Sequence, residues 1–288
     1  MTGSVGLIGF PIRHSISPAF QQPAFDAEGL DIRYELWELP GDQLGVAIER
    51  LREPSCLGAN VTIPHKARII PHLDAVDSTA RALGAVNTIV HRGGQLVGSN
   101  TDLIGFADAL RRDANFEPRG KRVVVLGAGG SARAVVAALA MGGAIAIDVC
   151  ARRIEQAASL MVDFHGAGIT GGPTTVTAHR LDQSPALKNL LDKAELVVNA
   201  TPIGMVHRPE AGESAIPADW LYPGLLVFDL VYNPAETPLL RAARERGART
   251  LNGLPMLIYQ GAASFERWTG HTAPVELMRK KALEALGG

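Results

Sequence analysis

The sequence predicts an α/β protein of two domains, in which mostly parallel sheets are covered by helices on both faces. Three observations support this fold class. Short apolar segments end in Gly or Asn, amphipathic segments rich in Ala and Leu alternate with them, and the chain of 288 residues is long enough for two ordinary domains. No repeat of solenoid period and no low-complexity tract interrupts the alternation.

The apolar segments are expected to form buried strands because each is short, apolar and bounded by turn residues. They cover residues 5–9, 57–61, 123–127, 146–150, 195–199 and 225–230. Elsewhere apolar residues recur at the spacing of a helix. The expected helices cover residues 18–29, 42–52, 74–82, 102–113, 131–141, 153–163, 237–247 and 255–268. Spacing alone does not tell which domain receives the last of these helices.

A polar segment that contains proline and glycine marks the expected domain boundary. The sequence NFEPRGKRVVVLG (115–127) passes from such a segment into a strongly β-branched strand, as if a new sheet begins there. We therefore place the first domain at about 1–105 and the second at about 106–252.

Composition excludes several classes of protein. The formal net charge is −1, whereas a general binder of nucleic acids or anionic membranes needs an excess of Lys and Arg. The chain has no apolar stretch of about 18 residues and no basic leader, so we expect a cytoplasmic protein without a membrane span. Cys56 and Cys150 are too few for a disulfide scaffold or a four-thiolate metal site, and we expect no bound metal.

The segment VVVLGAGGSARAVVAALA contains the motif G-x-G-x-x-G/A in Gly127, Gly129 and Ala132. It follows an expected strand and opens an expected helix. The glycines allow a tight turn and the close approach of a pyrophosphate, and the helix N-terminus offers free N–H groups and partial positive charge. Glycine-rich turns also serve packing, but in this setting the motif favours dinucleotide binding.

The end of the next strand predicts which dinucleotide binds. An acidic residue there holds the ribose 2′-hydroxyl of NAD, whereas arginine holds the 2′-phosphate of NADP. Here the strand leads into Ala151, Arg152 and Arg153, and Asp148 lies too far inside the strand to be a good ribose partner. Two guanidinium groups favour NADP, although Arg153 could instead be a solvated residue at a helix start.

Polar residues in the first domain stand at strand ends and in tight turns. Ser15 and Ser17 precede a helix, and Ser17 before Pro18 is by itself best explained as a helix N-cap. The others are Asn60, Thr62, Lys66, Asn87, Asn100 and Asp102. Each alone would be an ordinary turn residue. Together they suit a polyhydroxylated ligand that bears a carboxylate.

Eight segments in this order resemble those of the shikimate dehydrogenase family: HSISP, GANVTIPHK, LGAVNT, GSNTD, GAGGSARA, NATPIGM, DLVYNPAETPLL and NGLPMLIYQGAASF. The resemblance covers essentially the whole chain. It implies an N-terminal α/β substrate-binding domain completed by C-terminal helices (253–288), and a Rossmann-type, doubly wound NADP-binding domain. It also implies the reversible NADPH-dependent reduction of 3-dehydroshikimate to shikimate, a step of aromatic amino-acid biosynthesis.

The resemblance carries roles onto particular positions. Lys66 and Asp102 match the catalytic pair, and Ser15 and Ser17 match the hydroxyls that hold the substrate carboxylate. The remaining substrate contacts are Thr62, Asn87, Tyr232 and Gln260. The nucleotide contacts are Gly127, Ala128, Gly129, Gly130, Ser131, Arg152, Thr201, Leu230 and Gly253. The chain departs from the family pattern at Ala151, where asparagine is frequent, and at Asn252, where aspartate is frequent.

The expected chemistry explains why a lysine follows the strand at 57–61. Negative charge develops on the carbonyl oxygen as hydride arrives, and Lys66 can neutralise it if it lies within hydrogen-bond reach, with Asp102 orienting the ammonium group. The ligand would then lie between the two domains. Two other interpretations remain open: a quinate/shikimate dehydrogenase that uses NAD or NADP, and a non-catalytic NADP-binding sensor of the same fold. The chain could be a monomer or a homodimer.

Overall fold

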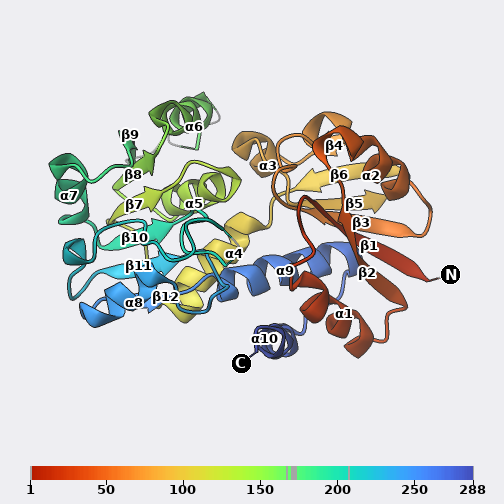
Figure 1. Ribbon diagram of the computed structural model, residues 1–288. Helices are drawn as coiled ribbons and strands as arrows, with labels where there is room; N and C mark the ends of the chain where they lie inside the picture. Colours follow the sequence, from red (N-terminus) through yellow and green to blue (C-terminus); the bar gives the residue numbers. More distant parts are fainter. Residues whose placement is uncertain (1, 167, 170–173, 207, 288) are drawn as a thin grey trace. The chain divides into compact units, whose positions relative to one another are not determined.

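The computed structural model describes residues 2–166, 168–169, 174–206 and 208–287 (Figure 1). The chain divides into two compact units, one formed by Met1–Gly105 with Ile258–Gly288 and the other by Phe106–Leu257. It leaves the first unit within α4 (Asp102–Asp108) and returns to it within α9 (Leu254–Thr269). The C-terminal helices therefore belong to the N-terminal unit.

The first unit contains a six-stranded mixed sheet. Its strands are β1 (Gly3–Gly9), β2 (Ile32–Glu38), β3 (Cys56–Val61), β4 (Ala75–Val76), β5 (Thr88–Arg92) and β6 (Gln95–Ser99), in the order β2-β1-β3-β5-β6-β4. Strand β5 runs antiparallel to both of its neighbours, and the other pairs are parallel. The reversal comes from a hairpin turn at Gly93 and Gly94, which both adopt the positive φ that a tight turn between strands requires.

Five helices complete this unit: α1 (Ser17–Ala27), α2 (Leu44–Leu51), α3 (Ser78–Leu83), α9 and α10 (Val275–Ala285). Figure 1 shows α2 and α3 on one face of the sheet and α1, α9 and α10 on the other. The helix expected at 74–82 is α3, and the prediction began it too early. Asp77 caps α3 by accepting the N–H of Ala80, so residues before it are outside the helix and Ala75–Val76 pair with β6 instead.

The second unit contains a six-stranded sheet in which every pair is parallel. Its strands are β7 (Arg122–Leu126), β8 (Ala146–Ala151), β9 (Thr175–Arg180), β10 (Leu196–Asn199), β11 (Leu226–Asp229) and β12 (Arg249–Leu251), in the order β12-β11-β10-β7-β8-β9. The chain starts in the middle at β7, moves outward to β9 and then crosses to β10. This is the doubly wound order of a Rossmann fold, and the order reverses between β7 and β10.

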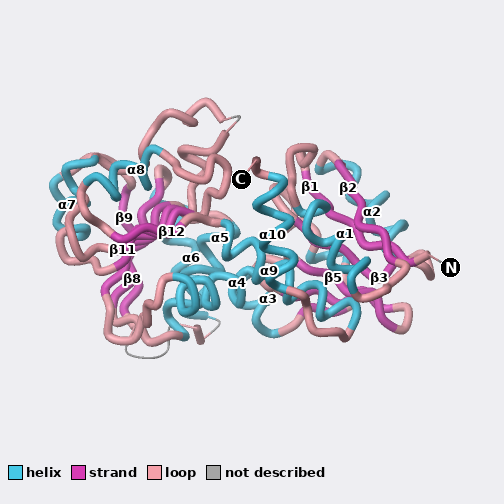
Figure 2. Tube along the Cα trace, turned by 90° about the horizontal axis from the view of Figure 1, so that it is seen from below, coloured by secondary structure: helices cyan, strands magenta, loops and turns pink. Residues whose placement is uncertain are grey.

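Helices cover both faces of this sheet. They are α5 (Gly130–Met141), α6 (Ile154–Gly166), α7 (Pro185–Leu191) and α8 (Pro238–Glu245). Figure 2 shows α5 and α6 on one side of the strands and α7 and α8 on the other. Ser184 and Thr237 start α7 and α8 as N-caps, each followed by a proline at the start of the helix.

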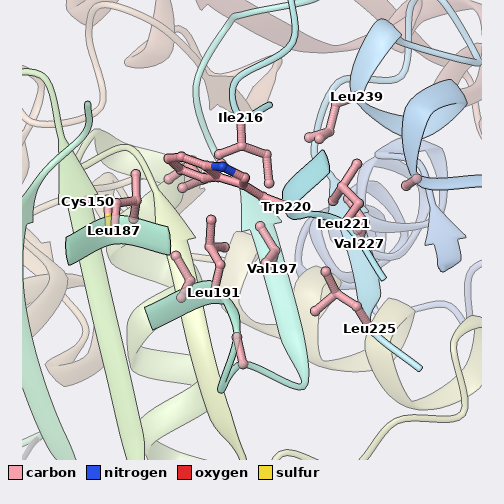
Figure 3. Packing of buried hydrophobic residues seen from close by; sticks show 14 of the residues in the cluster. Cys150, Leu187, Leu191, Val197, Ile216, Trp220, Leu221, Leu225, Val227 and Leu239 are labelled. Carbon is pink, nitrogen blue, oxygen red and sulfur yellow. The ribbon is translucent and has the colours of Figure 1, made fainter. Parts of the chain in front are cut away.

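The core beneath α7 and α8 is a cluster of buried aliphatic side chains with Trp220 in its midst (Figure 3). Val124, Val197 and Val227 enter it from β7, β10 and β11, and alternate residues of these strands face the other helices. The central strands are packed against this core on one face and against α5 on the other. Their carboxyl ends, where the loops begin, are therefore held in place.

Candidate active site

The first unit brings four polar segments to one edge of its sheet. Lys66 follows β3, Asp102 follows β6, and the serine pair follows β1, so all lie beyond carboxyl ends of strands. Asn87 precedes β5, but β5 is antiparallel, and its first residue Thr88 pairs with Asn60 near the end of β3 and with Ser99 at the end of β6. The reversed strand therefore delivers Asn87 to the same edge.

Lys66 and Asp102 form a close ion pair at this edge. Lys66 Nζ lies 2.5 Å from Asp102 Oδ2, and the two side chains are 14% and 7% exposed. Backbone bonds fix both residues: Val86 N–H donates to the carbonyl of Lys66 at 2.8 Å, and Asp102 N–H donates to Oδ1 of Asn100 at 3.0 Å. A charged pair that is mostly shielded from water interacts more strongly than a surface pair.

Asn87 holds the second oxygen of the Asp102 carboxylate. Its Nδ2 donates to Asp102 Oδ1 at 2.8 Å, while its own Oδ1 accepts the N–H of Thr101 at 2.7 Å. Nδ2 also lies 3.3 Å from Oε1 of Gln260, which α9 contributes. The structure thus brings together Lys66, Asp102, Asn87 and Gln260, four of the residues expected to contact the substrate.

The expected N-cap role of Ser17 is wrong. Helix α1 begins at Ser17 itself, its N-cap position is Ile16, and no side-chain cap bond forms. The N–H of Ser17 instead donates to Oγ of Ser15 at 3.3 Å, and the two hydroxyl oxygens are 3.2 Å apart. Ser15 therefore accepts the first N–H of α1 from outside the cap position, and the hydroxyl of Ser17 makes no capping bond.

Tyr34 lies beside Ser17, and Thr62 follows the strand that pairs with β1. Burial raises the pKa of the Tyr34 phenol, and a hydrogen bond with Ser17 partly opposes this. Thr62 is half-buried just after β3, and its N–H donates to the carbonyl of Ile8 in β1 at 2.8 Å. This bond ties the loop that carries Lys66 to the strand that precedes Ser15.

In the second unit, the glycine motif lies at the carboxyl end of β7, where the strand order reverses. Gly127 has φ +108°, and a Cβ there would lie 3.0 Å from the carbonyl oxygen of Ala200 and 3.2 Å from Thr201. Only glycine fits this turn well. Gly129 is the N-cap of α5, it is exposed, and nothing lies within 4 Å of where its Cβ would be. The turn therefore leaves room for a phosphate against the free N–H groups of α5.

The arginine pair follows β8. Arg152 and Arg153 are both exposed, and Nη1 of Arg152 lies 3.5 Å from Oε1 of Glu210. Asp148, the acidic residue of the same strand, is paired with Nε2 of His179 at 2.8 Å. Its carboxylate is therefore engaged within the sheet, whereas both arginines that follow the strand are exposed.

Leu230 and Gly253 are neighbours in the second unit. A Cβ at Gly253 would lie 1.9 Å from the carbonyl oxygen of Leu230, and the N–H of Gly253 donates to the carbonyl of Val231 at 3.0 Å. Close backbone approach thus requires glycine at this position. Tyr232 also lies in this unit, two residues beyond Leu230, and burial raises the pKa of its phenol.

Sequence reasoning missed a group of buried hydroxyl residues behind Asn87. Thr88, Thr101 and Ser264 are each fully buried, and their oxygens lie within hydrogen-bonding distance of one another. Their only sequence signal was position: Thr88 and Thr101 adjoin recognised residues, and Ser264 stands one helical turn after Gln260. Within the described ranges, no cluster of three metal-ligating side chains exists, and no helix is long and apolar enough to cross a membrane.

A doubly wound sheet with a glycine turn at its switch point, together with a shielded lysine–aspartate pair in the first unit, is typical of nicotinamide-dependent dehydrogenases. Family comparison is more specific. Residues 7–89 match the shikimate dehydrogenase substrate binding domain, and residues 253–283 match the shikimate 5′-dehydrogenase C-terminal domain. The chain is 46% identical to the NADP(+) shikimate dehydrogenase of Moorella thermoacetica, over 99% of this chain and 94% of the relative.

Solved structures give the same result. Shikimate 5-dehydrogenase of Thermus thermophilus in complex with NADP(H) and shikimate is 34% identical, with a TM-score of 0.85 over 99% of this chain and 100% of that one. Quinate dehydrogenase of Corynebacterium glutamicum in complex with NAD is 31% identical, with a TM-score of 0.87 over 98% and 99%. The chain belongs to the shikimate dehydrogenase family.

Proposed function

We propose that the protein catalyses the reversible NADPH-dependent reduction of 3-dehydroshikimate to shikimate, a step of aromatic amino-acid biosynthesis. One observation supports this most strongly: the ion pair of Lys66 and Asp102, shielded from water and oriented by Asn87. This arrangement presents a proton donor at the edge of the first sheet where several strands end, and the same edge carries hydroxyl and amide groups. The NADP(+) shikimate dehydrogenase at 46% identity and the Thermus enzyme with both ligands support the same reaction.

NADPH supplies the hydride when it is bound. Lys66 holds a proton at Nζ and gives it to the oxygen of the ring ketone as negative charge develops there; in the oxidative direction Lys66 takes that proton back. Asp102 keeps the ammonium group in one position through its Oδ2 and is itself held at Oδ1 by Asn87. A proton donor fixed in this way loses little motional freedom at the moment of reaction.

The substrate is bound by neutral donors and acceptors. Ser15 and Ser17 bind its carboxylate, which the N-terminal end of α1 also favours. The ring hydroxyls are assigned to Thr62, Asn87, Gln260, Tyr232 and the Lys66–Asp102 pair. An analogue that lacks one hydroxyl leaves a polar group of the site unmatched, and this is the source of specificity.

The nucleotide is bound by the second unit. Gly127, Ala128, Gly129, Gly130 and Ser131 take the pyrophosphate, because the turn has room for it and α5 begins at Gly130. Arg152 and Arg153 bind the 2′-phosphate. Thr201, Leu230 and Gly253 would supply the remaining contacts to the nucleotide. On this basis the unit of Met1–Gly105 with Ile258–Gly288 is the substrate domain, and the unit of Phe106–Leu257, which includes Gly253, is the NADP domain.

A cytoplasmic location is part of the proposal. Both cysteines are free and buried, and burial raises the pKa of Cys150 to about 12, with a further contribution from nearby carboxylates. Unpaired thiols of this kind are typical of proteins from a reducing compartment.

The test follows nicotinamide absorbance with shikimate or quinate as substrate, each with NADP+ or NAD+. We expect shikimate with NADP+ to give the highest kcat/KM by a wide margin, because both serines and both arginines are present. Preference for quinate with NAD+ would assign the protein the activity of the Corynebacterium relative. Nucleotide binding without turnover of either substrate would instead indicate a sensor.

A further inference from the structure

Ser264 lies at the centre of a buried hydrogen-bond network behind Asn87. The residue is fully buried in α9, and its Oγ lies 3.0 Å from Asn60 Nδ2, 2.8 Å from Thr88 Oγ1 and 3.1 Å from Thr101 Oγ1. It also lies 2.9 Å from the backbone carbonyl of Gln260, one turn earlier in the same helix. All of these residues belong to the first unit.

The orientation of two amides in this network follows from backbone groups. The N–H of Thr101 lies 2.7 Å from Oδ1 of Asn87, and only an oxygen can accept it, so the NH2 group of Asn87 faces the Asp102 carboxylate. The backbone carbonyl of Asn87 in turn lies 3.2 Å from Nδ2 of Asn60, and only an NH2 group can donate to it. Oδ1 of Asn60 therefore accepts from Tyr34, 2.8 Å away.

The directions of the hydroxyl bonds then follow from counting protons. The carbonyl of Gln260 can only accept, so Ser264 donates its single proton there. Ser264 is consequently an acceptor, and three possible donors, Asn60, Thr88 and Thr101, face its two lone pairs. Thr88 has another acceptor in Oδ1 of Asn87 at 3.0 Å, so we assign its proton there and the lone pairs of Ser264 to Asn60 and Thr101. Once Thr101 donates to Ser264, its lone pairs are available to Nδ2 of Asn87 at 2.9 Å. The two N–H groups of Asn87 are then matched to Thr101 and Asp102.

We propose that Ser264 is a positioning residue for the Lys66–Asp102 pair, acting through Thr101 and Asn87. If the Ser264 oxygen is removed, the Thr101 hydroxyl loses the acceptor that holds its proton away from Asn87. Oδ1 of Asn87, 3.2 Å from the Thr101 hydroxyl, then accepts this proton instead. The Asn87 amide is then held less firmly, and so is the carboxylate that orients Lys66. This inference rests on the proposed reaction and adds a residue that does not touch the reacting atoms.

The test compares Ser264→Ala with a matched control, Ser99→Ala. Ser99 is also a buried serine of the first unit, but its hydroxyl donates to the backbone carbonyl of Thr88 and contacts neither amide. We expect Ser264→Ala to lower kcat about tenfold, as loss of an outer hydrogen-bond partner often does. NADPH affinity should not change, and Ser99→Ala should keep nearly wild-type kcat.

The isotope effect separates positioning from a general loss of structure. With NADPH deuterated at the transferred hydrogen, Ser264→Ala should show a larger primary isotope effect on kcat than the wild type, because slower chemistry becomes more rate-limiting. A smaller folded fraction lowers the rate without changing that ratio. Ser264→Cys fills the same space with a weaker hydrogen-bonding group, so it should fold and give an intermediate kcat.

A double-mutant cycle tests the route through Thr101. If Ser264 acts by that route, adding Ser264→Ala to Thr101→Val should lower kcat little further. The inference is refuted if Ser264→Ala and Ser99→Ala have the same kcat, or if the isotope effect of Ser264→Ala equals that of the wild type. It is also refuted if the effects of Ser264→Ala and Thr101→Val on kcat are independent. Wild-type protein inactive with shikimate would refute the proposed function and this inference with it, whereas an active wild type beside an unaffected Ser264→Ala refutes only the inference.

Discussion

Replacing Asp102 by asparagine breaks the Lys66–Asp102 pair with almost no change in shape. In the wild-type protein one carboxylate oxygen accepts from Lys66 at 2.5 Å and the other accepts from Asn87 at 2.8 Å. The introduced amide has a single oxygen, so it can accept from only one of these donors. Its NH2 group then faces the other donor at hydrogen-bonding distance.

The expected cost follows from the burial of the pair. Removing one partner of a buried ion pair typically destabilises a protein by about 3–5 kcal/mol. The Lys66 side chain is 14% exposed, so its ammonium group regains some hydration, and we expect the lower end, about 3 kcal/mol. Arg13→Met is the matched control in the same unit, because the Arg13–Glu38 pair has an arginine that is 89% exposed and should contribute less than about 1 kcal/mol.

The assay is urea unfolding followed by tryptophan fluorescence. Trp37 and Trp268 lie in the first unit and Trp220 in the second, so a Trp220→Phe background reports on the unit that contains the pair. A double-mutant cycle then compares the unfolding free energies of Asp102→Asn, Lys66→Met and the variant that carries both changes.

In the double variant the introduced amide can turn its oxygen toward Asn87, and methionine needs no ionic partner. The double variant should therefore be more stable than the sum of the single changes predicts, by about 2 kcal/mol. Additivity within about 0.5 kcal/mol would refute the claim that the two groups interact as a shielded pair.

Three further predictions follow from the second unit. Arg152→Ala combined with Arg153→Ala should raise the KM for NADP+ at least tenfold and leave that for NAD+ nearly unchanged; an equal effect on both nucleotides would contradict the 2′-phosphate assignment. Burial raises the pKa of the Asp229 carboxyl from 3.8 to about 6, so the folded protein binds the carboxyl proton more tightly than the unfolded chain does. The stabilisation from this proton is complete below pH 3.8 and is lost as the pH rises through about 6. The loss is about 3 kcal/mol, and the difference between the urea stabilities of wild type and Asp229→Asn across pH 4–7 should show it; a flat difference would refute it. Gly253→Ala should unfold the unit or abolish soluble expression, because its Cβ would lie 1.9 Å from a backbone oxygen of Leu230, and a melting temperature like that of the wild type would contradict this reading.

The continuously apolar strands of each sheet could be predicted from sequence, but the short strands and those with polar residues could not. The expected strands became β1, β3, β7, β8, β10 and β11, and all of these are apolar because they are covered on both faces. The edge strands β2, β4, β9 and β12 were missed, and so were β5 (TIVHR) and β6 (QLVGS) inside the first sheet, both of which carry polar residues. β9 (TVTAHR) is partly exposed along its length, and β4 and β12 are only two and three residues long, so none of them forms an apolar run.

The site shows the same limit. Residues such as Lys66 and Asp102 could be singled out because they stand in sequence segments, GANVTIPHK and GSNTD, that resemble those of a known family. Ser264 could not, since a serine in an amphipathic helix has no local feature that distinguishes it. Its role depends on β5 running antiparallel, which brings Thr88 beside Asn60 and places Asn87 next to Asp102. Tertiary pairing of this kind leaves no trace in residue spacing.

The most direct test of the central claim measures Lys66→Met with NADPH and 3-dehydroshikimate, alongside the Kd of the variant for NADPH. If Lys66 delivers the proton, turnover should fall by about 10²–10⁴ while the Kd stays at its wild-type value. Turnover within a few-fold of the wild type would contradict the account, and so would an equal loss of turnover and nucleotide binding.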